Sequence, residues 1–131
     1  MMPHQNTTTT RAMTEPLSAS AAILRIVERA RAAGARYVHL EQNGEWARFR
    51  FRHGGVLAPW PGSPRIDYAQ LVSRLKGAVG LGTRAIGQLE RRAFQVQVGE
   101  DVVEVQLLIQ PGVDGEQVVL GLPGRQAVSD E

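Results

Sequence analysis

Three arginines at alternating positions form the densest group of chemically capable side chains in the sequence. They are Arg48, Arg50 and Arg52, and Trp46 precedes them at the same spacing. Because residues two apart in a β-strand share a face, a strand here would line up three guanidinium groups about 7 Å apart. Guanidinium groups bind phosphate and carboxylate well. The row therefore indicates a docking surface for phosphate or an acidic partner, with Trp46 as an aromatic neighbour; the alternative is a solvated outer face.

The other reactive side chains form no pattern of a catalytic or metal site. The chain has no cysteine and three histidines. His39 and Glu41 are spaced like metal ligands on one strand face, but no third ligand follows at a recognisable spacing. The glycines of 77–82 end a helix, whereas a phosphate-binding loop opens one. No serine lies in a nucleophile-elbow context. We therefore expect no catalytic residue, no metal and no cofactor.

The amino-acid composition is typical of a globular protein. Its 131 residues suffice for one domain, with 43% hydrophobic and 21% charged residues and a net charge of +2. That charge does not mark a nucleic-acid binder, so nucleic acid is not an expected partner. No apolar stretch is long enough to span a membrane, and the N-terminus lacks the apolar segment of a signal peptide. We therefore expect no membrane span and a cytoplasmic protein.

The periodicity of apolar residues divides the chain into one domain between two tails. Residues 1–16 hold a threonine run and little apolar surface, which predicts a disordered tail. A single domain follows over 17–123, and 124–131 form a polar C-terminal tail. Within the domain a helix begins at Ser18 or Ser20 and ends at Gly34, and a second helix spans about Ile66 to Val79.

Strands account for the rest of the domain. Asn43-Gly44 is a strong signal for a two-residue hairpin, and residues 59–64 and 111–115 are predicted loops. Alternating apolar residues predict strands near 37–41, 46–52, 56–57, 94–98, 103–109 and 118–122. The order α-β-β-β-α-β-β-β with hairpin connections predicts an α+β fold: a mainly antiparallel sheet of about six strands with two packed helices, PAS-like in kind.

Five segments of the chain resemble, in order and at compatible spacing, the PAS-like N-terminal domain of type II secretion and type IV pilus-assembly ATPases. The segments are 34–41, 50–57, 73–81, 103–106 and 115–122. In that family this domain precedes a RecA-like ATPase domain and packs against it in a hexameric ring, and its arginines help to hold nucleotide. Carried over by position, Arg50 and Arg52 match two of those arginines. Gln106 and Gly121 stand where the family has two further arginines.

This resemblance implies a protein-interaction module of a type II secretion or type IV pilus system. Its expected partner is a RecA-like ATPase or a cytoplasmic component of the secretion apparatus, and a homo-oligomer stays open. The sequence contains no Walker A motif, so we expect no ATP hydrolysis by this chain. The alternatives are a PAS-like sensor of a small ligand or nucleotide, and nucleic-acid binding through the arginine-lined strand.

Overall fold

The computed structural model describes residues 18–82, 87–112 and 115–122. Within these residues the elements follow the predicted order, α-β-β-β-α-β-β-β. The strands form one six-stranded sheet, and every neighbouring pair in it is antiparallel. The prediction of an α+β fold with two helices and a mainly antiparallel sheet is confirmed. Both predicted tails, 1–16 and 124–131, lie outside the described residues.

The first helix, α2 (Ala19–Ala33), begins and ends where the sequence predicts. The side chain of Ser18 accepts a hydrogen bond from the amide of Ala21 at 3.2 Å, which satisfies a backbone donor of the first turn. Gly34 ends the helix with a φ of +72°, a left-handed conformation that glycine adopts without a steric penalty. The side of α2 that faces the sheet is buried and apolar: Ala22, Ile23, Ile26, Val27 and Ala30.

The second helix, α3 (Tyr68–Ala78), begins two residues later than predicted. Ile66 is fully buried, and its carbonyl accepts a hydrogen bond from the amide of Ala47 at 2.9 Å. Because this bond ties Ile66 to the sheet, the helix can begin only after it. Asp67 is the N-cap, and its carboxylate accepts a hydrogen bond from the amide of Gln70.

The strand order across the sheet is β3-β2-β1-β6-β5-β4. The last strand in sequence therefore lies in the middle, between the first hairpin and the second. The strands are β1 (Tyr37–Asn43), β2 (Trp46–His53), β3 (Val56–Pro59), β4 (Glu90–Val98), β5 (Asp101–Gly112) and β6 (Gly115–Gly121).

The predicted hairpin turn and the predicted loop over 111–115 both shift. The hairpin predicted at Asn43-Gly44 forms, but its two-residue turn is Gly44-Glu45, because Asn43 still pairs with Trp46; Gly44 has a φ of +66°. The loop predicted over 111–115 is wrong at both ends, because Pro111 still pairs with Glu116 and β6 begins at Gly115. Proline is tolerated there because β4 pairs with β5 only as far as Ile109, so no described strand lies beside Pro111 on that side.

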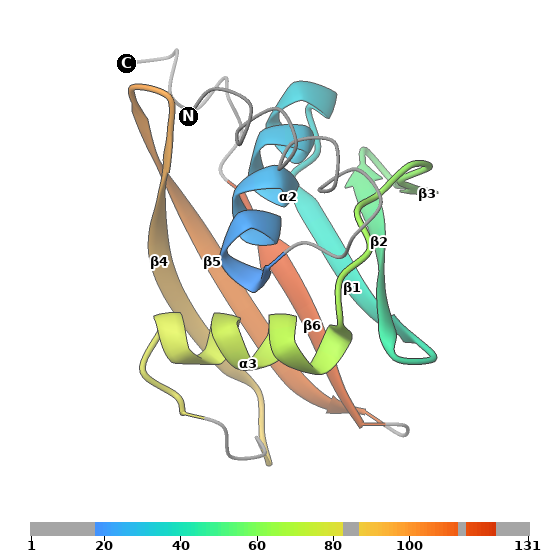
Figure 1. Cartoon of the computed structure of the whole chain (residues 1–131), viewed down its shortest axis with the longest axis vertical. Coiled ribbons are helices and arrows are strands. Elements are labelled where there is room, and N and C mark those ends of the chain that lie inside the picture. The colour runs from blue at the N-terminus through green and yellow to red at the C-terminus, as the bar shows by residue number, and fades with distance from the viewer. Residues whose placement is uncertain (1–17, 83–86, 113–114, 123–131) are drawn as a thin grey trace, which may run out of the picture.

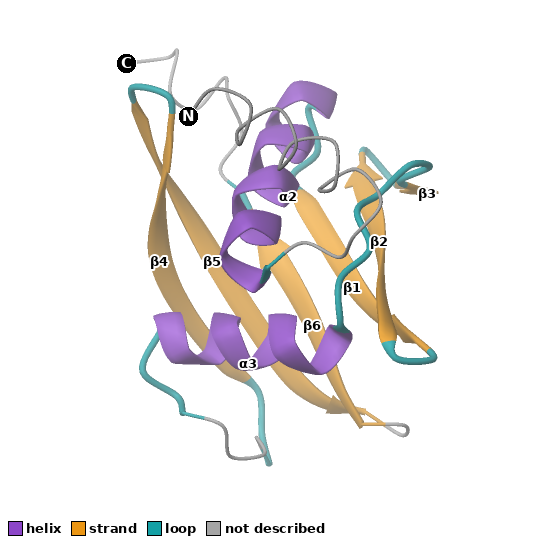
Figure 2. Ribbon diagram, viewed as in Figure 1, coloured by secondary structure: helices purple, strands orange, loops and turns teal. Residues whose placement is uncertain are grey.

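Both helices pack on the same face of the sheet (Figures 1 and 2). Side chains from both layers fill the space between helices and sheet. The largest fully buried ones include Phe49, Ile26, Leu71 and Leu107. Neither α2 nor α3 is long and apolar enough to cross a membrane.

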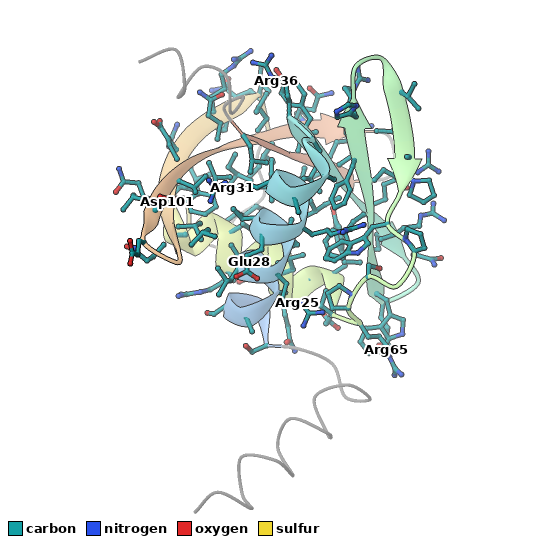
Figure 3. The ribbon with its side chains drawn as sticks, turned by 90° about the horizontal axis from the view of Figure 1, so that it is seen from above. Arg25, Glu28, Arg31, Arg36, Arg65 and Asp101 are labelled. Carbon is teal, nitrogen blue, oxygen red and sulfur yellow. The ribbon has the colours of Figure 1, made fainter. Side chains whose placement is uncertain are left out.

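Two ion pairs attach the helices to the sheet. Arg31 of α2 contacts Asp101, at the start of β5, with 3.3 Å between the nearest nitrogen and oxygen (Figure 3). Lys76 of α3 contacts Glu116 of β6 at 2.7 Å, and its side chain is only 6% exposed. One contact thus links α2 to β5 and the other links α3 to β6.

The opposite face of the sheet is covered by neither described helix, and we call it the open face. It consists of the strand residues that alternate with the buried ones. Its central members are Tyr37, His39 and Glu41 on β1, Arg48, Arg50 and Arg52 on β2, Gln117, Val119 and Gly121 on β6, and Glu104, Gln106 and Leu108 on β5.

Candidate functional site

The three arginines identified in the sequence all lie on the open face, in the middle of β2. Their alternation with buried Ala47, Phe49 and Phe51 sends every guanidinium group away from the core. The strand register places each one opposite a residue of β1: Arg48 opposite Glu41, Arg50 opposite His39, and Arg52 opposite Tyr37.

One carboxylate serves two of these arginines. Glu41 Oε1 accepts a hydrogen bond from Arg48 Nε at 3.1 Å, and Arg48 Nη2 lies at the same distance from it. Arg50 Nε reaches the same oxygen at 3.4 Å. Among the described residues, Arg52 makes no ion pair with an acidic side chain. The row is therefore only partly neutralised, and its positive charge increases from Arg48 towards Arg52.

The whole open face has more arginine than glutamate. Arg91 of β4 is a fourth arginine on this face, because it pairs with the open-face residue Leu108, but it lies four strands away from the row on β2. Against these four side chains the face carries Glu41 and Glu104. The excess is concentrated on β2, whereas β6, β5 and β4 contribute mainly glutamine and aliphatic side chains: Gln95, Gln97, Gln106, Gln110, Gln117, Leu108 and Val119.

Trp46 does not extend the arginine row as a stacking surface. The guanidinium carbon of Arg65 lies 4.4 Å from the centroid of the Trp46 ring, a cation–π contact. The backbone of Trp46 also forms an isolated antiparallel β-bridge with Asp67, the N-cap of α3. The sequence placed Trp46 beside the row as an aromatic neighbour; in the structure its ring contacts Arg65, in the segment that leads into α3.

Sequence reasoning missed two residues that the structure adds to the row. Tyr37 is 42% exposed and lies opposite Arg52, and half-buried His39 lies opposite Arg50. Both belong to β1, so neither could be linked to the arginines without the register. The Asn43-Gly44 signal predicts that the two strands pair, but a turn at these two residues would place His39 opposite Arg48. The observed turn is Gly44-Glu45, which shifts the register by two residues.

The position of His39 among these groups lowers its pKa below the ordinary value of 6.5. The main cause is desolvation by burial, followed by repulsion from Arg52; Glu41 opposes the shift and Arg50 adds to it. The folded state therefore favours the neutral imidazole at neutral pH. A neutral ring next to two guanidinium groups can accept a hydrogen bond without adding a further positive charge.

This pKa predicts that the protein loses stability as the pH falls through and below 6.5. In that range the unfolded chain binds a proton at His39 that the folded chain resists, so protonation favours unfolding. The His39→Gln variant should show a smaller loss, measured as the difference in urea midpoint between pH 7.5 and pH 5.5. An equal loss in both proteins would contradict the assignment, and the His39 ring protons followed by NMR against pH give the pKa directly.

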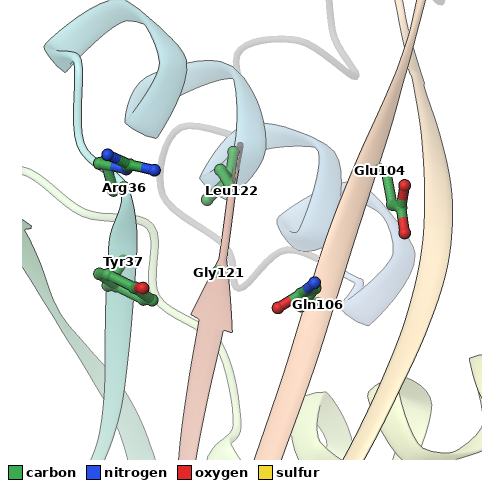
Figure 4. Close-up of a pocket in the computed structure, with 6 residues that line it drawn as sticks. All are labelled: Arg36, Tyr37, Glu104, Gln106, Gly121 and Leu122. Carbon is green, nitrogen blue, oxygen red and sulfur yellow. The ribbon is translucent and has the colours of Figure 1, made fainter. Parts of the chain in front are cut away.

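A hollow of about 210 Å³ lies on the open face beside the row (Figure 4). Gly121, which has no side chain, is one of the residues that line it. A Cβ placed on Gly121 would lie 3.4 Å from the ring atom Cε1 of Tyr37, so the tyrosine ring forms one wall. Arg36, Glu104 and Gln106 supply polar groups around the rim. The hollow thus brings a cation, a carboxylate and an aromatic ring together next to Arg52.

Within residues 18–82, 87–112 and 115–122, no three histidine or acidic side chains gather as a metal site would require. No family model matches the sequence, and no curated protein matches it either.

Proposed function

We propose that this chain is a non-catalytic protein-interaction module that docks through its open face on an acidic surface of a partner protein. The observation that carries this proposal is the excess of arginine over glutamate on a sheet face that neither described helix covers. Guanidinium groups suit carboxylates because they donate parallel hydrogen bonds in a fixed geometry. An uncovered sheet face offers such donors on a rigid framework.

Glu41 determines how readily each arginine binds a partner. Arg48 contacts this carboxylate with two nitrogens at 3.1 Å, so an incoming acidic group must compete with Glu41 for it. Arg50 contacts it with one nitrogen at 3.4 Å and is easier to recruit. Arg52 has no such competitor among the described residues. Arg52 and Arg50 should therefore contribute most to docking.

The first partner to test is a RecA-like ATPase of a type II secretion or type IV pilus system, or another cytoplasmic component of that apparatus. The resemblance to the N-terminal domain of such ATPases supports this choice. Arg50 and Arg52 carry part of that resemblance, and both belong to the row on β2. In this proposal the chain acts in the cytoplasm, as a binding partner of the ATPase.

Charge reversal of the two arginines should abolish most of the docking. The purified chain is titrated by calorimetry with the RecA-like secretion or pilus ATPase from the same genome. The Arg50→Glu/Arg52→Glu variant should bind about 100-fold more weakly, because it puts two carboxylates against an acidic surface. Binding by the unchanged chain should weaken with added salt, since the contacts lie at the surface.

The control reverses a charge on the other side of the molecule. Arg29 is an exposed residue of α2, which packs on the opposite face of the sheet, so Arg29→Glu should leave the affinity unchanged. Equal affinity for the unchanged chain and the double variant would refute the open face as the docking surface. If extracts of the native host yield no secretion or pilus component on the immobilised chain, the ATPase assignment fails.

Tyr37 favours single-stranded nucleic acid as a second candidate ligand of this face. Its exposed ring lies beside Arg52, and single-strand binders combine basic side chains with aromatic rings on which bases stack. Tyr37→Ala separates the two candidates. It should reduce affinity for a fluorescent single-stranded oligonucleotide by about 1–3 kcal/mol if a base stacks there. Docking on a protein carboxylate depends on the arginines and should change far less.

A further inference from the structure

The two edges of the sheet differ in their capacity to pair with another strand. β3 forms one edge, has four residues and ends at Pro59, which lacks a backbone donor. Short edge strands and prolines are common protections against pairing. β4 forms the other edge, has nine residues and contains no proline. In the part of the chain that the structure describes, no strand pairs with the outer side of β4.

The turn that follows β4 fixes which of its backbone groups point outward. Val98 and Asp101 pair across a two-residue turn, so this pair shares hydrogen bonds across the turn. Bonded pairs alternate along an antiparallel ladder, so the even-numbered residues of β4 bond to β5. The amides and carbonyls of the odd-numbered residues then point away from the sheet: Arg91, Ala93, Gln95 and Gln97.

An apolar groove runs along β4 on the helix side. It has a volume of about 290 Å³ and lies between the strand and both helices. Leu24 of α2 lines this groove and is 36% exposed. A leucine on a helix that packs against a sheet usually faces the core. The other apolar side chains of the groove are Ile23, Ala78, Phe94 and Val96. A strand added to β4 would place alternate side chains at this groove.

The uncharged part of β4 suits an antiparallel pairing with a second copy of itself. Glu90, Arg91 and Arg92 lie at its start, residues 93–98 carry no charge, and Glu100 lies in the turn that follows. An antiparallel copy overlaps the uncharged halves and places Arg92 of each chain diagonally across from Glu100 of the other. Glu90 faces Glu100 in this register and is ion-paired with Arg92 at 2.8 Å. With Gln95 opposite Gln95, Phe94 faces Val96 of the second copy. A parallel copy would instead stack arginine on arginine.

We propose that two copies of this chain pair antiparallel through β4, about a two-fold axis at Gln95, to form one continuous sheet. The two-fold closes the assembly at two chains, because β3 at the outer edges resists further pairing. The axis stands perpendicular to the sheet, so both open faces lie on the same side. The dimer thereby presents two arginine rows to one partner, which raises the effective affinity for a repetitive partner.

A single cysteine tests this geometry cleanly, since the natural chain has none. In the proposed pairing the two Gln95 Cα atoms lie about 5.5 Å apart, within the range that a disulfide spans. The Gln95→Cys variant should form a covalent dimer under mild oxidation. Gln110→Cys, an exposed open-face position on β5, should stay monomeric on the same gel.

The noncovalent dimer should be visible by sedimentation equilibrium. We expect the unchanged chain to dimerise at tens of micromolar and Gln95→Lys to raise the dissociation constant at least about tenfold, because two lysines then face each other. Gln110→Lys is the matched control and should dimerise normally. A chain that is monomeric at 200 µM overturns the proposal. The proposal is also overturned if the chain dimerises but Gln95→Lys does not weaken the dimer and Gln95→Cys does not cross-link it. Such a dimer uses another surface.

Separate variants test the proposed dimer and the proposed docking function, so one proposal can be refuted without the other. Gln95→Lys alters the sheet edge and leaves Arg50 and Arg52 in place, so binding of a partner per chain should persist. Arg50→Glu/Arg52→Glu alters the opposite end of the sheet and should leave the dissociation constant of the dimer unchanged.

Discussion

Replacing Lys76 with alanine should lower the free energy of unfolding by about 3 kcal/mol. Lys76 is the only lysine of the chain, and its ammonium group lies 2.7 Å from a carboxylate oxygen of Glu116. Its side chain is 6% exposed and that of Glu116 is 20% exposed. Removing the cation leaves Glu116 largely desolvated without this ion pair, and that penalty exceeds the loss of an exposed ion pair. Urea denaturation at pH 7 measures the effect.

An ion pair whose carboxylate is exposed provides the control for Lys76. Arg31 lies 3.3 Å from Asp101, whose side chain is 67% exposed, so Arg31→Ala leaves a solvated carboxylate and should cost less than about 1 kcal/mol. The double variant Lys76→Met/Glu116→Leu removes both charges and should be more stable than Lys76→Ala. A cost below about 1 kcal/mol for Lys76→Ala would mean that solvent reaches this pair and that the pair contributes little to holding α3 on the sheet.

Local chemistry explains why the elements could be predicted from the sequence. The ends of α2 follow from Ser18 and Gly34, because capping and left-handed backbone depend on residues within one turn. The faces of β1 and β2 follow from alternation, because the period of a strand is two. The presence of a hairpin between them follows from Asn43-Gly44, although its turn is Gly44-Glu45. None of these inferences needs a distant segment of the chain.

Contacts between distant segments explain what the sequence did not predict. The position of β6 between β1 and β5 depends on pairing across the whole domain, and no local pattern encodes it. Burial of Lys76 follows from that position, since Glu116 of β6 comes to lie under α3. Prediction of the candidate site from the sequence was limited for the same reason. The arginine row was evident from β2 alone, whereas Tyr37 and His39 joined it through the pairing of β1 with β2.

The Phe49→Ala variant should lose about 4 kcal/mol of stability. Phe49 is 1% exposed and alternates with Arg48 and Arg50, so its ring anchors the strand segment that presents them. The Trp60 ring packs against Phe49 at 5.5 Å and against Phe51 at 5.4 Å between centroids. Removing the Phe49 ring leaves a cavity beneath the arginine row. Thermal and urea denaturation give the loss, and a cost below about 2 kcal/mol would contradict this role.

Trp60→Ala is the comparison variant for Phe49→Ala. It shows how far the loss of a neighbouring ring lowers stability when Phe49 still anchors β2. Trp60 is only partly buried and lies in the segment after β3, so its loss should cost less than the loss of Phe49. Phe49→Leu keeps most of the buried volume and should cost about 1 kcal/mol. If the core positions the arginines, Phe49→Ala should also weaken partner binding, at a temperature where it is folded, more than Phe49→Leu does. Equal affinities in the two folded variants would mean that pairing with β1 alone holds Arg50 and Arg52 in place.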